Sequence, residues 1–207
     1  MSVEKLSTGT REVDKALQGG LPKGYLTCLA GPASSGKTTL CLQIAYDMTQ
    51  KIVDALKVIV VSGQHSQQQM KERVGLISKN PEFDYREPLQ NLWLLSGRDA
   101  SDKLSLAKEV EADVLIFDSW PLAKDNLAVF SHENKITVLT ADPSIMDADL
   151  AHADVAVQIE VDAYQNNRRR LRLRKNRFGG TDGIGQLLAT TRGMLSDDAG
   201  TLARHHF

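Results

Sequence analysis

The 207-residue sequence has few cysteines, few aromatic residues and no long apolar run. Its two cysteines, Cys28 and Cys41, have neither the number of a disulfide framework nor the spacing of metal ligands, which favours buried thiols. No apolar stretch approaches the length of a membrane span, and the N-terminal segment lacks the basic-then-apolar pattern of a secretory signal. We therefore expect a cytoplasmic protein without a membrane partner.

An excess of one charge sign is also missing, because the formal net charge is −1. The basic residues are nevertheless clustered: between Arg168 and Arg177, seven of ten residues are Lys or Arg, so an anion-binding surface is expected there. Neither internal repeats nor low-complexity segments occur. The length favours a single domain over residues 1–195, followed by a polar tail at 196–207 that is expected to fray.

Apolar runs rich in β-branched residues alternate with amphipathic stretches along the chain. The predicted strands are Tyr25–Ala30, Val58–Ser62, Leu92–Ser96, Val114–Asp118, Ile136–Thr140 and Val155–Ile159. The predicted helices are Lys37–Gln50, Gln67–Ile77 and Ser101–Glu111. This alternation is typical of an α/β fold with a mostly parallel sheet and helices on both faces. The period-two pattern at residues 170–174 and a short strand at Gly185–Thr190 predict an antiparallel C-terminal hairpin.

A glycine-rich segment between the first strand and the first helix fits the phosphate-loop pattern G-x-x-x-x-G-K-[ST]. A chance glycine-rich turn is the alternative, but the strand before it and the helix after it favour a nucleotide site. Backbone N–H groups and the helix N-terminus would hold the phosphates of ATP, with Lys37 at the β- and γ-phosphates and Thr38 on Mg²⁺. The expected nucleotide-binding residues are Gly31, Pro32, Ala33, Ser34, Ser35, Gly36, Lys37, Thr38 and Thr39.

A carboxylate ends the apolar strand Val114–Asp118. Asp118 is expected to hold Mg²⁺ through water, together with Thr38. An N-cap for the segment that follows is the alternative interpretation of Asp118.

Three further parts of the sequence carry a family resemblance. The opening Ser7–Leu17, followed by Gly19–Gly24, resembles the lead-in of RecA-superfamily ATPases, and Lys175–Gly179 (KNRFG) matches a motif of the bacterial RadA/Sms recombination proteins. The segment Val60–Ser66 is similar to the family's VSGEES segment. The resemblance runs from about Leu6 to Leu195 and implies a RecA-like P-loop NTPase core that assembles head to tail into rings or filaments, with ATP at each subunit interface.

The resemblance also implies roles for the basic strand. Lys175 and Arg177 correspond to fingers that reach the γ-phosphate of a neighbouring subunit, while a solvated strand face is the alternative. For Arg168 and Arg169 the solvated face is the favoured interpretation. Candidates for contacting single-stranded DNA are Arg170, Arg172 and Arg174. Because this strand lacks interleaved aromatic residues for base stacking, we expect phosphate neutralisation with little sequence preference, or contact with the neighbouring subunit instead.

The sequence departs from the family at two places. Gln64 stands where the family has the glutamate that activates the attacking water, and an amide does not accept a proton at neutral pH. The adjacent His65 could serve as the base instead, but this alternative is less favoured because adjacent residues at a strand end are expected to point to opposite sides. After Ile136–Thr140, the family's sensor and DNA-facing loop are replaced by Ala141-Asp142-Pro143, and the stretch Ser119–Lys135 is also short.

Two functions follow from this pattern. The first is a RadA/Sms-like protein of DNA recombination and repair that assembles on single-stranded DNA with ATP, hydrolyses it slowly and works with other recombination or replication proteins. The second is a nucleotide-gated assembly protein that keeps the RecA fold without turnover. A small-molecule kinase is a third reading, for which we locate neither a lid nor a substrate site.

Overall fold

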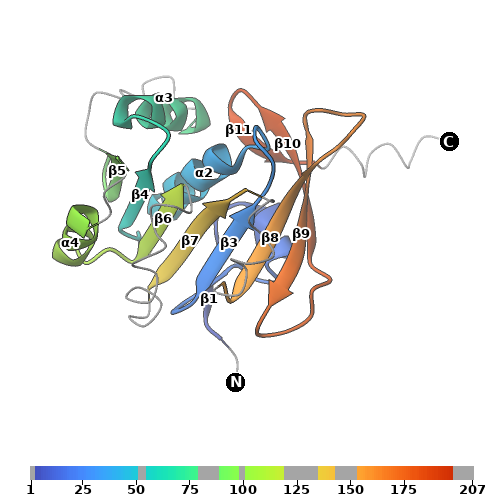
Figure 1. Ribbon diagram of the computed structural model, residues 1–207, viewed down its shortest axis with the longest axis horizontal. Helices are drawn as coiled ribbons and strands as arrows, with labels where there is room; N and C mark the ends of the chain where they lie inside the picture. The colour runs from blue at the N-terminus through green and yellow to red at the C-terminus, as the bar shows by residue number, and fades with distance from the viewer. Residues whose placement is uncertain are drawn as a thin grey trace.

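A nine-stranded sheet forms the centre of the protein (Figure 1). The computed structural model describes residues 3–50, 55–78, 89–97, 101–118, 135–142 and 153–197. The sheet strands are β3 (Leu26–Ala30), β4 (Val58–Ser62), β5 (Leu92–Ser96), β6 (Val114–Asp118), β7 (Ile136–Ala141), β8 (Val155–Val161), β9 (Arg168–Asn176), β10 (Ile184–Thr190) and β11 (Gly193–Ser196). Their spatial order is β11-β10-β9-β8-β3-β7-β6-β4-β5. A separate antiparallel pair joins β1 (Lys5–Leu6) to β2 (Leu21–Pro22).

The six strands from β8 through β3, β7, β6 and β4 to β5 are parallel. All residues of β3, β4, β6 and β7 are buried, as expected for a parallel sheet that is covered on both faces. This burial explains why these segments read as continuous apolar runs in the sequence. The predicted mostly parallel sheet is confirmed.

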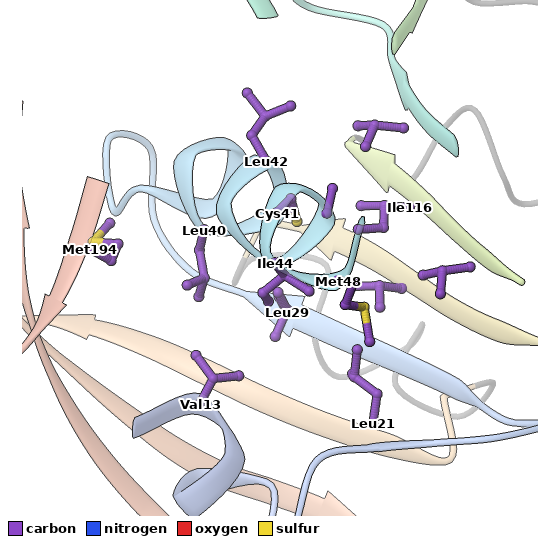
Figure 2. Packing of buried hydrophobic residues seen from close by; sticks show 14 of the residues in the cluster. Val13, Leu21, Leu29, Leu40, Cys41, Leu42, Ile44, Met48, Ile116 and Met194 are labelled. Atoms are coloured by element: carbon purple, nitrogen blue, oxygen red, sulfur yellow. The ribbon is translucent and has the colours of Figure 1, made fainter. Parts of the chain in front are cut away.

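Helices cover both faces of the sheet. On one face lie α1 (Arg11–Ala16), α2 (Lys37–Thr49) and α3 (Gln67–Ser78), whose apolar residues share a core with Leu29 of β3 (Figure 2). Leu40, Ile44 and Met48 recur at the four-residue spacing that places side chains on one side of a helix. On the other face, α4 (Ser101–Glu109) contributes Ala107 to a second core. The predicted placement of helices on both faces is confirmed.

The C-terminal strands β9, β10 and β11 are antiparallel, as is the pairing of β9 with β8. Leu171 and Leu173 are buried against the helix-covered core, whereas Arg170 and Arg174 are exposed, so the period-two pattern is confirmed. The antiparallel part extends beyond the predicted hairpin, because β11 continues to Ser196.

Several predicted features lie outside the described residues. Residues 119–134 and 143–152 belong to these segments, so the expected shortening of the two loops has no structural account here. The same holds for residues 198–207 of the expected tail. In the described part of the chain, no helix is long and apolar enough to cross a membrane.

Gly185 lets β10 lie directly against α1, and this contact yields a stability prediction. A Cβ at Gly185 would lie 2.1 Å from the backbone oxygen of Glu12, so Gly185→Ala forces the two elements apart. We expect the free energy of unfolding in urea to fall by about 1–3 kcal/mol, the usual cost of overpacking. Gly179→Ala is the matched control, because the nearest atom to its Cβ would be 3.4 Å away. Equal stability of the two variants would contradict this packing.

Candidate functional site

The loop between β3 and α2 has an unusual backbone. Ser34 and Gly36 have φ angles of 61° and 96°, in the left-handed region that costs a non-glycine residue energy. Gly31 has no room for a side chain, because a Cβ there would lie 2.6 Å from Ser35 Oγ and 3.0 Å from the Ile159 oxygen. The loop therefore curls over the start of α2, where the first N–H groups of the helix have no partner within the helix.

A cavity of about 690 Å³ opens above this loop. It lies at the carboxyl ends of β4, β6 and β7, where ligands bind in open α/β sheets. Its walls are Ala33, Ser34, Gly36, Lys37, Thr38, Thr39, Gln64, His65, Arg73, Asp118, Thr140, Ala141, Asp142, Arg169, Ala189, Thr190 and Met194.

The Lys37 ammonium is folded back onto the loop. Its Nζ donates hydrogen bonds to the carbonyl oxygens of Gly31, at 2.6 Å, and Pro32, at 2.9 Å. Burial lowers the pKa of Lys37, and the charges of Asp142 and Asp118 oppose that effect. A half-buried cation of this kind gains from a nearby anion, because the anion offsets its desolvation.

The Asp118 carboxylate collects three hydroxyl groups at the end of β6, and only 3% of the residue is exposed. Thr38 Oγ1 of α2 lies 2.9 Å from Oδ2 and 3.0 Å from Oδ1. Ser62 of β4 donates at 3.0 Å and Thr140 of β7 at 3.1 Å. The two expected metal-side residues, Thr38 and Asp118, are thus in direct contact. The alternative role of Asp118 as an N-cap concerns a segment outside the described residues.

Gln64 and His65 both line the cavity. Strand β4 ends at Ser62, so the two residues lie in the bend after it, where both backbone N–H groups donate to Ser62 Oγ. Both residues therefore reach the same cavity, and because strand alternation does not extend into a bend, the expectation that they point to opposite sides has no basis in strand geometry. His65 Nδ1 lies 3.5 Å from Asp118 Oδ2.

Arg169 corrects another expectation. It is 9% exposed, and its Nε donates to the carbonyl oxygen of Ser35 at 2.9 Å, so it does not lie on a solvated strand face. The sequence contained a usable signal, since Arg169 has the same parity on β9 as Leu171 and Leu173 and therefore shares their buried side. Its neighbour Arg168 is 38% exposed and pairs with Asp197.

Two further contributors went unrecognised in the sequence. Arg73 of α3 lines the cavity, and its Nη1 donates a hydrogen bond to Thr39 Oγ1 at 2.8 Å. An arginine on the polar side of a helix gives no signal that separates this role from ordinary exposure. Met194 of β11 packs on Gly36, and the Gln43 amide binds both its N–H, at 2.7 Å, and its C=O, at 2.9 Å.

The predicted fingers lie at the opposite end of the sheet. The Arg177 N–H donates to the Asp154 oxygen, and the Asp154 N–H donates to Leu26 at the start of β3, whereas the phosphate loop follows the end of β3. The Arg177 side chain is 68% exposed and lies 2.9 Å from Asp154 Oδ1, which raises the pKa of Arg177. Lys175, the second-last residue of β9, is half-buried.

The three DNA candidates lie on the face of β9 that points away from the buried leucines. Arg170 and Arg174 are exposed, and Arg172 is half-buried with its Nε 3.5 Å from Glu160 Oε1. Of the predicted residues, the structure therefore places Ala33, Ser34, Gly36, Lys37, Thr38, Thr39, Gln64 and Asp118 on the wall of one cavity. Gly31, Pro32 and Ser35 belong to the same loop without lining that wall, and the predicted fingers and DNA candidates lie outside it.

The cavity fits a nucleotide polyphosphate with Mg²⁺. Among the described residues the buried Ser35 hydroxyl has no hydrogen-bond partner, so the loop still has a polar atom to satisfy. A helix N-terminus and a lysine suit phosphate oxygens. The oxygen set of Thr38 and Asp118 suits Mg²⁺, which takes a few protein oxygens together with substrate phosphates.

Comparison with known proteins places residues 1–159 in a family described as the AAA domain. The "DNA repair protein RadA" of Campylobacter jejuni is 28% identical over 93% of this chain and 46% of its own length. Those of Aquifex aeolicus and Streptococcus pneumoniae are 29% and 28% identical, over 92% and 94% of this chain and 46% and 49% of theirs. The chain thus spans about half the length of these curated relatives.

Proposed function

This chain belongs to the AAA domain family and is a RecA-like P-loop ATPase resembling RadA, and on that basis we propose that it binds ATP with Mg²⁺ in the cavity above α2. The observation that carries the proposal is the convergence of Lys37, Thr38 and Asp118 at one cavity. The Lys37 ammonium leaves its two carbonyl partners for the β- and γ-phosphates. Thr38 and Asp118 would hold Mg²⁺, which supplies charge neutralisation on the phosphates.

The bound nucleotide is hydrolysed slowly in this proposal. Gln64 lines the cavity where a water-activating group is needed, and its amide can orient a water molecule but cannot take a proton from it. The same observation favours the second candidate function, a nucleotide-gated assembly protein without turnover.

Copies of the chain assemble head to tail, so that one copy's Arg177 and Lys175 meet the next copy's nucleotide. Support comes from the position of these residues at the end of the sheet opposite their own cavity, with Arg177 exposed. A guanidinium supplied by a neighbour would stabilise charge on the transferring phosphoryl group, making turnover depend on assembly.

Single-stranded DNA is the proposed partner of the assembled protein, together with other recombination or replication proteins. The names of the relatives support a role in DNA repair, and the exposed Arg170 and Arg174 supply charge for the DNA backbone, with Arg172 beside them. Binding by phosphate neutralisation weakens steeply as salt is added.

The first test measures ATP binding and turnover with and without single-stranded DNA, alongside particle size in the same buffers. We expect slow turnover that DNA stimulates, and loss of both binding and turnover in Lys37→Ala. Lys108→Ala is the matched control, since this exposed lysine of α4 lies outside the cavity. Unchanged ATP affinity in Lys37→Ala would refute the site. Assembly with ATP but without turnover would select the second candidate function.

Gln64→Glu tests the missing base. If Gln64 occupies the water-activating position, the carboxylate should raise the turnover rate by about 10²–10⁴-fold, the usual contribution of a general base. Gln67→Glu, an exposed position on α3 outside the cavity, introduces the same charge as a control. A rate that stays at the wild-type level would remove Gln64 from the mechanism.

Mixing two inactive variants tests the neighbour's finger. Lys37→Ala lacks a working loop and Arg177→Ala lacks the finger, so each alone should turn over ATP poorly. In a random equimolar mixture, about a quarter of head-to-tail interfaces join an intact loop to an intact finger and should recover that share of the rate. No recovery on mixing, with both variants folded and assembling, would show that Arg177 does not act across an interface.

A further inference from the structure

A buried arginine lies directly behind the phosphate loop. Arg169 is 9% exposed, and its Nε and Nη2 donate to the carbonyl oxygens of Ser35, at 2.9 Å, and Ser34, at 3.4 Å. Its Nη1 donates to the carbonyls of Asn166 and Arg168. The guanidinium thus holds two consecutive loop carbonyls against the first residues of β9, and it also forms part of the cavity wall.

The positive charge of Arg169 has no counter-charge among the residues that the structure describes. Within the described residues its hydrogen-bond partners are backbone carbonyls, and no carboxylate forms an ion pair with it. Burial lowers the pKa of Arg169, which reports the same desolvation. The adjacent Arg168 shows the usual arrangement, with its Nε 2.9 Å from Asp197 Oδ2. A buried cation that has hydrogen-bond partners but no counter-charge is costly, and an anion bound at the adjacent phosphate loop would offset that cost.

The hydrogen bonds from Arg169 also set the direction of a loop N–H group. The Ser35 carbonyl and the Gly36 N–H belong to one trans peptide and therefore point in opposite directions. When Arg169 holds the carbonyl from behind, the Gly36 N–H is fixed on the other side of that peptide. Gly36 lines the cavity, so an anion there would meet an oriented donor without further ordering of the loop.

We propose that Arg169 is a positioning residue for the phosphate loop and that its buried charge makes the site prefer nucleotides with more phosphates. This inference rests on the proposed nucleotide site and adds a rule for ligand selection. ATP and ADP place two or more phosphates near the loop, whereas AMP places one. The contribution of Arg169 therefore grows with the negative charge of the ligand, which a purely structural residue would not do.

The experiment measures dissociation constants for ATP, ADP and AMP, each with Mg²⁺, by calorimetry on the full chain. In Arg169→Met we expect affinity for ATP to fall about tenfold or more, the scale of one lost charge-assisted hydrogen bond, and affinity for AMP to fall clearly less. Arg169→Lys keeps the charge and loses the fork, so its ATP affinity should lie between those of wild type and Arg169→Met. Lys108→Met, on α4, removes the same charge away from the loop and should bind as wild type.

Equal losses for all three nucleotides, or no loss, would overturn the inference. If Arg169→Met does not fold, Arg169→Gln decides the matter, because it removes the charge but keeps a side-chain amide that can donate to the loop carbonyls, and its ratio of ATP to AMP affinity should also fall. Lys37→Ala distinguishes a failure of the proposed Arg169 role from a failure of the nucleotide site. Normal ATP binding in Arg169→Met together with lost binding in Lys37→Ala refutes only the role of Arg169, whereas normal binding in Lys37→Ala refutes the nucleotide site itself.

Discussion

The Asp118 carboxylate joins α2 to three strands at the carboxyl end of the sheet. It ends β6, and its two oxygens accept hydrogen bonds from Thr38 of α2, Ser62 of β4 and Thr140 of β7. A buried carboxylate is tolerated only when its lone pairs are used, so these hydroxyls and the carboxylate require one another. The hydrogen bond from Thr38, in the first turn of α2, therefore positions the start of that helix, and with it the phosphate loop, against the end of β6.

The parallel strands give the sheet two chemically different ends. At the carboxyl end lie the loop, Asp118 and Gln64, and at the amino end lies Arg177 beside Asp154. The antiparallel return of β9 along β8 produces this separation, since it carries the chain from Arg169 at the loop to Arg177 at the far end. In our proposal a subunit therefore uses one end of β9 for its own nucleotide and offers the other end to a neighbour.

Sequence reasoning recovered the parts of the fold that burial on both faces enforces. The predicted strands matched because short continuous apolar runs, most of them containing β-branched residues, are typical of buried strands, and α2, α3 and α4 matched because their apolar residues recur at helical spacing. The short elements escaped: α1 has six residues, too few for a period, and is held by Asp14 binding Ser7 and Thr8. The two-residue strands β1 and β2 carry no pattern at all.

The candidate site was predictable where a motif fixes the chemistry, and less so where the fold brings in distant residues. The span from Gly31 to Thr39 and Asp118 could be read from spacing, but Arg73 arrives from the exposed side of α3 without any sequence signal. Arg169 carried a signal in its strand parity, which a cluster of seven basic residues obscured. The number of basic residues predicts only that a charged surface exists, whereas the alternation of side chains along the strand predicts which arginines are buried.

Binding and turnover make different physical demands on this cavity. Holding a polyphosphate needs cations and oriented N–H groups, which Lys37, Arg73, Arg169 and the start of α2 supply. Hydrolysis needs in addition a group that can take a proton from water, and Gln64 lacks that capacity. Because the two sets of residues do not overlap, a chain can keep the first while the second weakens. In our proposal, nucleotide occupancy then acts as a signal whose lifetime is set by nucleotide release and by assembly, because hydrolysis is slow.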